Sequence, residues 1–277
     1  MNSKIIKATR FVGHIRIIRR SLRYRLFNIL KKDFAFEVNL YGYKYTGNLN
    51  NFIDRSVFFF GAHEKEQLDF SKNFIRNATV VDCGANTGSH SLFYSAFAKN
   101  VLAIEASKIK TKELQNRISL NNINNIVLLN CGVGSSDNVS MPFYESQGDN
   151  EGVSSFVEDF SVQNSLSGNV LIRTLDSIIN EQKIAKVNYI KIDVEGFDYE
   201  VLKGAENIIK RDEPVIQIEF SPRDHKKLEE FLSKYPMYEA RNLIVNRPFF
   251  IFNRYRGKTI KLKPSLRSEV LLFPQKI

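Results

Sequence analysis

The sequence predicts an α/β fold in which a mostly parallel sheet is covered by helices on both faces. Five apolar runs alternate with helix-like segments along the middle of the chain, and the runs are apolar throughout. Such runs are typical of parallel strands buried on both faces and joined by crossover helices. A glycine-rich turn follows the first run, where an open parallel sheet places its ligands. We therefore expect a Rossmann-like domain.

The expected elements can be placed in chain order. Residues 36–47 alternate well enough to form a strand pair or hairpin, and residues 64–76 have helical spacing. The strand candidates that follow are 79–83, 100–106, 125–133, 187–196 and 213–221, and the helix candidates between them are 88–98, 107–120 and 197–210.

Two further segments complete this organisation. The polar insertion 135–170, rich in Ser, Gly and Asn, is expected to be a mobile loop over the site. In the tail, 248–257 and 268–273 predict an antiparallel pair that closes one edge of the sheet. We expect residues 1–60 to form a basic helix with a small strand appendage, and 61–277 to form the main domain.

Charge is distributed unevenly along the chain. Residues 1–32 hold ten basic residues and no acid, 33–239 hold 21 basic and 29 acidic residues, and 240–277 hold nine basic residues and one acid. An acidic centre argues against a core domain that grips nucleic acid. The spacing in 1–32 predicts an amphipathic helix, which either packs on the domain with its arginines in solvent or contacts a membrane surface or another anionic partner.

The sequence also bears on the compartment. No apolar run approaches the roughly 18 to 20 residues of a membrane span, and the N-terminus lacks the pattern of a signal peptide. Cys83 and Cys131 lie in strand-like segments without metal-ligand spacing, so we expect reduced core residues. The expected location is the cytoplasm, with the inner face of the membrane as the place where the basic ends would act.

The glycine-rich turn is the first candidate site. Asp82, Gly84, Asn86 and Gly88 form the pattern D-x-G-x-N-x-G, and Glu105 ends the next strand candidate, where a carboxylate can accept hydrogen bonds from a ribose. A dinucleotide site has a second glycine where Asn86 stands. A carboxylate at Asp82 disfavours a pyrophosphate and favours a ligand with an ammonium and a sulfonium group. The pattern therefore favours S-adenosylmethionine (SAM), and a purely structural turn is the alternative.

Six stretches together resemble a known family. They are VVDCGANTGSHSLFYS, VLAIEAS, LLNCGVGSSD, RTLDSI, YIKIDVEGFDYEVLKGA and PVIQIEFSP, in the order and spacing of the FkbM-type SAM-dependent methyltransferases, over roughly residues 60–225. The resemblance implies a class I methyltransferase fold, with a mostly parallel seven-stranded sheet and an antiparallel edge strand.

The resemblance also implies roles for individual residues. Asp82, Gly84, Asn86 and Gly88 would line the methionine end of the cofactor, Glu105 with the adjoining Ala106 would hold the ribose, and Asn130 and Cys131 would lie beside the adenine. This chain has NCG where relatives often have NAA, a departure that keeps the residues small.

Carboxylates at the ends of two later strand candidates supply the candidate chemistry. Asp193 and Glu195 share one side of the strand if its extended conformation persists, Asp198 follows, and Glu219 would reach the same rim from the neighbouring strand. A hydroxyl acceptor needs a base or a cation that lowers its pKa. We expect Asp193, Glu195 and Glu219 to be catalytic, as a base and as hydrogen-bond acceptors for substrate hydroxyls. Two alternatives are that they are oxygen ligands of Mg²⁺ or that their roles are structural.

Three other polar residues have simpler explanations. A histidine placed like His90 or His225 is more often a helix-terminus or surface group than a catalytic one. Asp176 is expected to cap the next helix.

The resemblance implies O-methylation, and a rim of carboxylates suits an acceptor with several hydroxyls. The leading acceptor class is a sugar in a surface polysaccharide, glycolipid or other glycan, and a small natural product is the alternative. Two other classes stay open: an NAD-dependent oxidoreductase and a membrane-docking module without catalysis.

Overall fold

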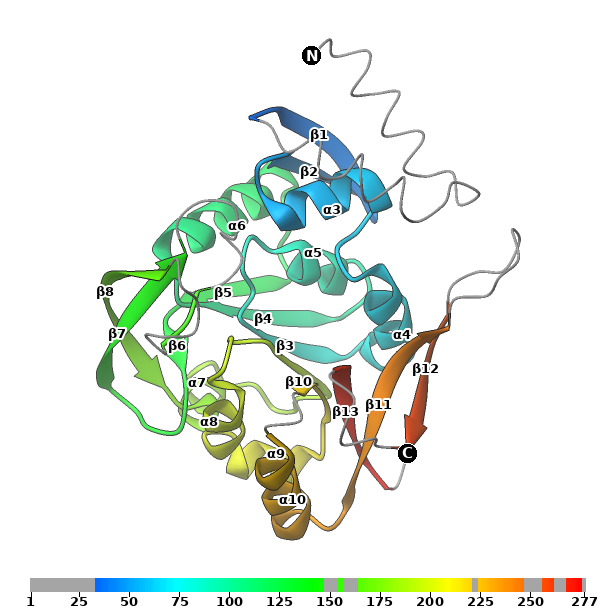
Figure 1. Cartoon of the computed structure of the whole chain (residues 1–277), viewed down its shortest axis with the longest axis vertical. Coiled ribbons are helices and arrows are strands. Elements are labelled where there is room, and N and C mark those ends of the chain that lie inside the picture. Colours follow the sequence, from blue (N-terminus) through cyan, green and yellow to red (C-terminus); the bar gives the residue numbers. More distant parts are fainter. Residues whose placement is uncertain are drawn as a thin grey trace.

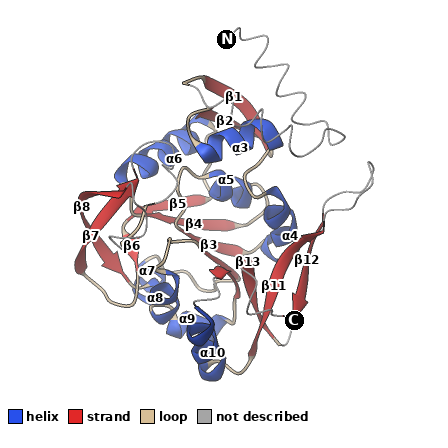
Figure 2. Cartoon of the chain, in the orientation of Figure 1, coloured by secondary structure: helices blue, strands red, loops and turns tan. Residues whose placement is uncertain are grey.

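A computed structural model describes residues 33–146, 154–156, 164–220, 224–246, 256–261 and 268–275. The chain forms an eight-stranded sheet with helices on both faces, beside a two-stranded and a three-stranded sheet (Figure 1 and Figure 2). The expected α/β class is therefore confirmed. The amphipathic helix expected in 1–32, with its proposed membrane contact, falls outside the described residues.

The elements have the following bounds. The strands are β1 (Ala35–Leu40), β2 (Tyr43–Asn48), β3 (Thr79–Cys83), β4 (Asn100–Glu105), β5 (Ile126–Asn130), β6 (Gly132–Val133), β7 (Val139–Ser146), β8 (Asn164–Arg173), β9 (Tyr189–Ile192), β10 (Val215–Phe220), β11 (Tyr238–Asn246), β12 (Arg256–Lys261) and β13 (Ser268–Pro274). The helices are α3 (Phe52–Phe60), α4 (Lys65–Ile75), α5 (Ser89–Ser95), α6 (Lys108–Leu120), α7 (Leu175–Glu181), α8 (Asp198–Lys203), α9 (Glu206–Asp212) and α10 (His225–Lys234).

The large sheet has the strand order β12-β11-β13-β10-β9-β3-β4-β5. Strands β5, β4, β3, β9 and β10 are parallel to one another, whereas β13 lies antiparallel between β10 and β11. This is the class I methyltransferase topology with one additional edge strand, β12, so the sheet has eight strands instead of the expected seven. Between β3 and β9 the order in which strands are added to the sheet reverses, since β4 and β5 extend it on one side and β9 and β10 on the other. This switch point opens a ligand site at the carboxyl ends of the two strands.

Alternation along the strands assigns side chains to the two faces. Val81, Leu102 and Ile190 pack in one core cluster with residues of α7, α8, α9 and α10. Val80 and Val101, one residue earlier on their strands, pack on the other face with residues of α3, α4, α5 and the β1–β2 hairpin. The expected hairpin at 36–47 is thus confirmed, and it shares a core with the sheet.

The insertion 135–170 was wrongly expected to be a loop. Its residues 139–146 and 164–173 form the antiparallel strands β7 and β8, which join β6 in the three-stranded sheet. Phe143, Phe156 and Ile172 are buried together, with Met141 against them. In β7 the polar or exposed Ser140 and Pro142 alternate with Met141 and Phe143, the pattern of a half-buried strand. Residues 147–153 and 157–163 lie outside the described part.

Two details in the C-terminal third of the chain also differ from expectation. The single helix expected over 197–210 is two helices, α8 and α9, separated at Gly204, where an added Cβ would lie 1.9 Å from the Gly134 carbonyl oxygen. Of the expected tail pair, 268–273 lies within β13, which pairs with β10 and β11 inside the sheet and does not close its edge, whereas residues 248–255 lie outside the described part of the chain. The mixed polar sequence of β11 gave little sign of a strand.

Candidate active site

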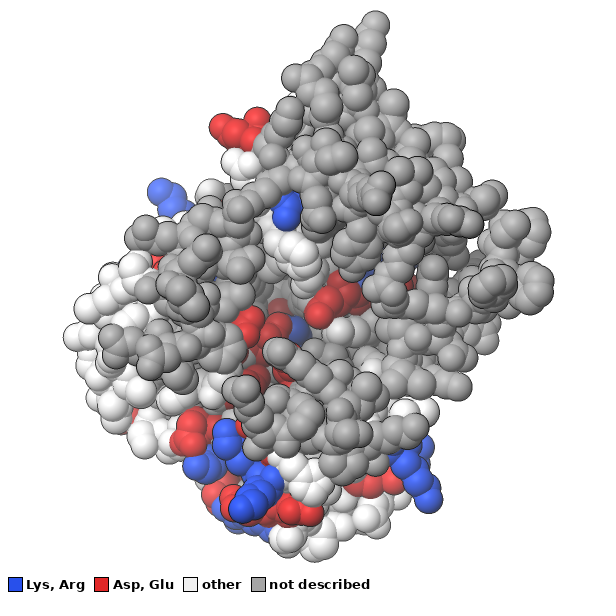
Figure 3. All heavy atoms as spheres, viewed as in Figure 1, with Lys and Arg blue, Asp and Glu red and all other residues white. Residues whose placement is uncertain are grey.

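A cleft of about 220 Å³ lies at the carboxyl ends of β3, β4 and β9. Figure 3 shows acidic side chains gathered in the hollow of this face. The cleft brings together seven of the residues expected to bind cofactor or to be catalytic: Gly84, Asn86, Glu105, Ala106, Cys131, Asp193 and Glu195.

Glu105 is fixed by backbone amides at the end of β4. Its Oε2 accepts a hydrogen bond from the Asn86 amide at 2.7 Å, and its Oε1 accepts one from the Ser107 amide at 2.8 Å. Each carboxylate oxygen has two lone pairs, so each oxygen can still accept a hydrogen bond from a ligand hydroxyl. The amide contacts tie the end of β4 to the turn after β3 and give the carboxylate one orientation.

The turn after β3 requires glycine for a reason of backbone approach. Gly84 has φ +78°, and a Cβ there would lie 2.0 Å from the Asp193 carbonyl oxygen. Its amide and that of Ala85 both donate to the Ile104 carbonyl. Gly84 therefore allows the carboxyl ends of β3, β4 and β9 to converge.

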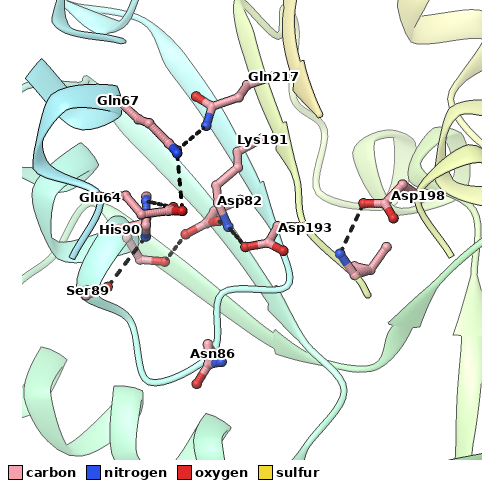
Figure 4. Close-up of polar contacts among 12 residues, drawn as sticks. Glu64, Gln67, Asp82, Asn86, Ser89, His90, Lys191, Asp193, Asp198 and Gln217 are labelled. Atoms are coloured by element: carbon pink, nitrogen blue, oxygen red, sulfur yellow. Dashed lines mark hydrogen bonds and ion pairs between the residues drawn. The ribbon is translucent and has the colours of Figure 1, made fainter. Parts of the chain in front are cut away.

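Asp82 does not line the cleft, although it was expected at the methionine end of the cofactor. It is fully buried, and it is in register with Lys191 on the neighbouring strand β9. Its Oδ2 accepts a 2.6 Å hydrogen bond from the Ser91 hydroxyl, and its Oδ1 lies 3.6 Å from Lys191 Nζ (Figure 4). Because side chains alternate between faces, both charges point toward the helices that cover the sheet, behind the cleft.

Lys191 is a residue that the sequence analysis missed. It is 4% exposed, and its Nζ donates to Asp193 Oδ2 at 3.0 Å as well as facing Asp82. Burial disfavours its charge, but Asp193 and Asp82 more than offset this and raise its pKa. A lysine between two isoleucines in a buried strand needs an acidic partner, and that signal was present in the sequence.

Gly88 and Asn130 also support the cleft without lining it. A Cβ on Gly88 would lie 2.2 Å from a Leu114 methyl carbon, so this glycine allows α5 to pack against α6. The Asn130 amide group donates to the Glu105 and Ala106 carbonyls and to the Thr111 hydroxyl. These hydrogen bonds hold the end of β4 against the end of β5 and the first turn of α6. Cys131 does line the cleft, and burial raises the pKa of its thiol to about 11.

The loop after β9 carries the two catalytic candidates. Asp193 is bound to Lys191, whereas burial, together with repulsion from Asp193, Glu219 and Asp198, raises the pKa of Glu195 to about 8. Glu195 has φ +43°, a conformation uncommon for a residue with a side chain. This backbone is supported by Ser155, whose hydroxyl donates to the Glu195 carbonyl at 2.7 Å.

Asp198 and Glu219 take up positions around this loop. The Asp198 carboxylate accepts hydrogen bonds from the Val194 and Gly196 amides, both at 3.3 Å, and burial first, then repulsion from Asp193, raises its pKa to about 6. Glu219, on the neighbouring strand β10, is not one of the residues that line the cleft, and its catalytic role stays a prediction. It still acts on Glu195 through its charge.

The raised pKa of Glu195 gives a stability prediction. A carboxyl whose pKa is higher in the folded than in the unfolded state opposes folding once pH exceeds its unfolded value, here 4.5. The free-energy cost of ionising Glu195 in the folded protein grows with pH up to about pH 8 and is constant above it. We expect Glu195→Gln to raise the free energy of unfolding by about 2 kcal/mol at pH 9, after allowance for partial exposure, and by much less at pH 5.

Urea unfolding at both pH values measures this effect. Glu37→Gln on β1, where the side chain is exposed, is the control and should change neither value by more than about 0.5 kcal/mol. If Glu195→Gln raised the free energy of unfolding equally at pH 5 and pH 9, the raised pKa of Glu195 would be contradicted.

Two of the simpler expectations can be compared with the structure. Asp176 lies in the first turn of α7, whose cap is Thr174, and its carboxylate accepts from the Asn207 and Ile208 amides at the start of α9. It therefore caps α9, which begins within the helix expected over 197–210. His225 lies on α10, 3.5 Å from Glu229, as a helix-end group away from the cleft.

One histidine lines the cleft, and a second, His90, lies in the first turn of α5. His63 lines the cleft from the connection between α3 and α4 and was not singled out from the sequence. Behind it, His90 Nε2 lies 3.3 Å from Glu64 Oε2 (Figure 4). Within the described part of the chain, no three His, Cys, Asp or Glu side chains are grouped as a cation site. The helices described there include none long and apolar enough to cross a membrane.

The fold and the cleft define a class I methyltransferase architecture, and comparison with known proteins gives the family. The chain belongs to the FkbM methyltransferase family: the Methyltransferase FkbM domain matches residues 82–239. The match begins at Asp82 and includes the cleft residues of β3, β4 and β9. The segment that contains His63 precedes it.

Individual relatives share low sequence identity with this chain. Methyltransferase 1 of Beauveria bassiana is 24% identical over 153 residues, which cover 48% of this chain and 61% of that protein. The chain thus matches about three fifths of the length of this relative. Among solved structures, Methyltransferase FkbM from Methylobacillus flagellatus has 18% identity and a TM-score of 0.46, covering 89% of this chain and 57% of that one. SMU.1697c from Streptococcus mutans, in complex with SAH, has 12% identity and a TM-score of 0.43, covering 76% and 96%.

Proposed function

We propose that this protein is a SAM-dependent O-methyltransferase whose acceptor is a hydroxyl group of a sugar. The observation that carries the proposal is that Glu105, on the cofactor side, and Asp193 with Glu195, on the acceptor side, open into one cleft at the switch point of the sheet. Family membership supports methyl transfer, and the carboxylates support an acceptor with several hydroxyls.

The chemistry of the cleft fits SAM. Glu105 presents a fixed carboxylate suited to the two hydroxyls of a ribose, and Ile104, Cys131 and Val133 supply an apolar wall for an adenine. Bound SAM would supply the methyl group on a sulfonium. The role of the protein is then to hold donor and acceptor in line and to take up the proton of the hydroxyl.

The acceptor side combines hydrogen-bonding and aromatic groups. Asp193 and Glu195 can bond sugar hydroxyls, and Phe52, Phe143 and Phe156 line the same cleft and offer rings against which a sugar can pack. A glycan precursor at the cytoplasmic face of a membrane would suit the basic N-terminal segment, 1–32. A small natural product with hydroxyl groups is the second candidate, because the aromatic wall would accommodate it equally well.

Removing the carboxylate of Glu105 tests the cofactor side. We expect Glu105→Ala to weaken SAM binding at least about 100-fold, since the ribose loses its acceptor and the turn after β3 loses its amide contact. Equilibrium dialysis with labelled SAM measures the affinity, and Glu37→Gln should bind like the wild type. An unchanged affinity in a folded Glu105→Ala protein would place the cofactor elsewhere.

Transfer of a labelled methyl group tests the acceptor class. The wild-type protein is incubated with tritium-labelled SAM and three sets of acceptors: alkyl glycosides, lipid-linked oligosaccharides and hydroxylated aromatic compounds. Label on a sugar oxygen supports the proposal, and label only on aromatic compounds favours the natural-product alternative. Label on nitrogen, or on none of the sets despite SAM binding, contradicts O-methylation of these classes.

A further inference from the structure

We infer that His63 is the general base that takes the proton from the acceptor hydroxyl. The inference rests on the proposed function and assigns a catalytic role to a residue outside the matched family domain. Neither the family match nor the carboxylate pattern after β9 points to this residue.

His63 faces the acceptor side of the cleft. It lines the same cleft as Phe52 of α3 and as Asp193 and Glu195 of the loop after β9. Phe52 is 45% exposed, unusual for a large aromatic side chain beside a cleft, and so offers a contact surface to a ligand. An acceptor bound between this wall and the loop after β9 would meet the imidazole.

The ring of His63 is held by its neighbours without loss of its hydrogen-bonding capacity. Its centroid lies 5.8 Å from that of Phe52 and 6.1 Å from that of His90, both in edge-to-face geometry. His90 in turn faces Glu64, which adopts φ +49° and bonds Gln67 through its side chain (Figure 4). Among the described residues, the ring nitrogens of His63 have no hydrogen-bond partner, so they can bond a ligand.

Burial favours the neutral form of His63. Burial lowers its pKa below the ordinary value of 6.5, and His90 and Lys191 also lower it, whereas Glu64 and Asp193 act in the opposite direction. The alternative bases are less suitable. Asp193 is bound to Lys191 Nζ, and Glu195 holds its own proton up to about pH 8. A neutral imidazole is the group that can accept a proton at neutral pH.

The step balances with the methyl donor of the proposed function. As the acceptor oxygen attacks the methyl carbon, the new O–CH₃ bond forms and the S–CH₃ bond breaks, with its electron pair passing to sulfur. The O–H bond breaks and its proton moves to the free nitrogen of His63. The sulfonium becomes a neutral thioether, and the imidazolium later releases its proton to water.

The test uses the different charges of the two cofactor forms. If His63 lies beside the transferred methyl group, the positive sulfonium of SAM repels an imidazolium, whereas the neutral thioether of S-adenosylhomocysteine (SAH) does not. Proton NMR of the histidine Cε1–H signals of the full-length protein, titrated with pH, reports this pKa in each complex. We expect a pKa about one unit lower with SAM than with SAH.

Controls separate this inference from the proposed function. His63→Gln assigns the signal and must bind SAH as the wild type does, since the inferred role is not in cofactor binding. His225, on α10 beside Glu229, is the internal reference and should titrate alike in both complexes. Equal His63 pKa values in the two complexes, or loss of SAH binding in a folded His63→Gln protein, would overturn the inference. Failure of the wild type to bind either ligand would overturn the proposed function itself.

Discussion

Replacing Lys191 by Met is expected to lower the free energy of unfolding by about 3–5 kcal/mol. Lys191 is 4% exposed and Asp82 is fully buried, and the two lie in register on adjacent strands. Without the ammonium group, the Ser91 hydroxyl is the one hydrogen-bond donor left to the Asp82 carboxylate among the described residues. A buried carboxylate without a cation carries most of its desolvation cost, so the loss far exceeds that of a surface ion pair.

Two further variants make this expectation specific. The double variant Asp82→Asn, Lys191→Met should recover at least about 2 kcal/mol relative to the single variant, since no buried charge is then left. Lys203→Met, in an exposed pair with Glu200 on α8, should cost less than about 1 kcal/mol. Urea unfolding at pH 7 measures all four proteins. If Lys191→Met were no more destabilising than Lys203→Met, the buried pair would have no structural importance.

The second large effect is expected at Gly84. Gly84→Ala should cost more than about 3 kcal/mol and abolish SAM binding, because it adds a Cβ 2.0 Å from the Asp193 carbonyl oxygen and imposes an unfavourable φ. Two backbone segments would have to separate. That movement displaces both Asp193 and the turn that contacts Glu105, so stability and binding should fall together.

Gly42 in the β1–β2 turn provides the matched control. Its φ is +101°, but a Cβ there would meet nothing within 4 Å. Gly42→Ala therefore isolates the cost of the backbone conformation, about 1 kcal/mol, and should leave SAM binding unchanged. Thermal unfolding and labelled-SAM binding of both variants measure the comparison. A similar loss of stability from Gly84→Ala and Gly42→Ala would exclude the close approach as the cause.

Much of the fold could be predicted because parallel strands buried on both faces have distinctive sequences. β3, β4 and β9 are apolar on two sides, and their neighbours in sequence have helical spacing. The strands that were missed, β7, β8 and β11, each have one polar face, and their polar residues resemble those of a loop. Burial of Phe143 against Phe156 is a tertiary contact that local composition does not reveal.

The site residues that belong to a recognisable sequence motif could be predicted. Glu105, Gly84 and Asp193 were identified because their spacing along the chain reflects neighbouring strands. Asp82 was misplaced, since its role depends on the face of β3 to which it points. His63 was missed because nothing in its local sequence marks it, and only the packing of α3 and α4 over the sheet brings it to the cleft.

The measurement that tests the central claim most directly is calorimetric titration of the wild-type protein with SAM, SAH and NAD. Micromolar binding of SAM and SAH, with one site per chain and no heat from NAD, is the predicted result. Binding of NAD in place of SAM would favour an oxidoreductase. If none of the three bound, the cleft at the carboxyl ends of β3, β4 and β9 would not be a cofactor site, and the methyltransferase proposal would be contradicted.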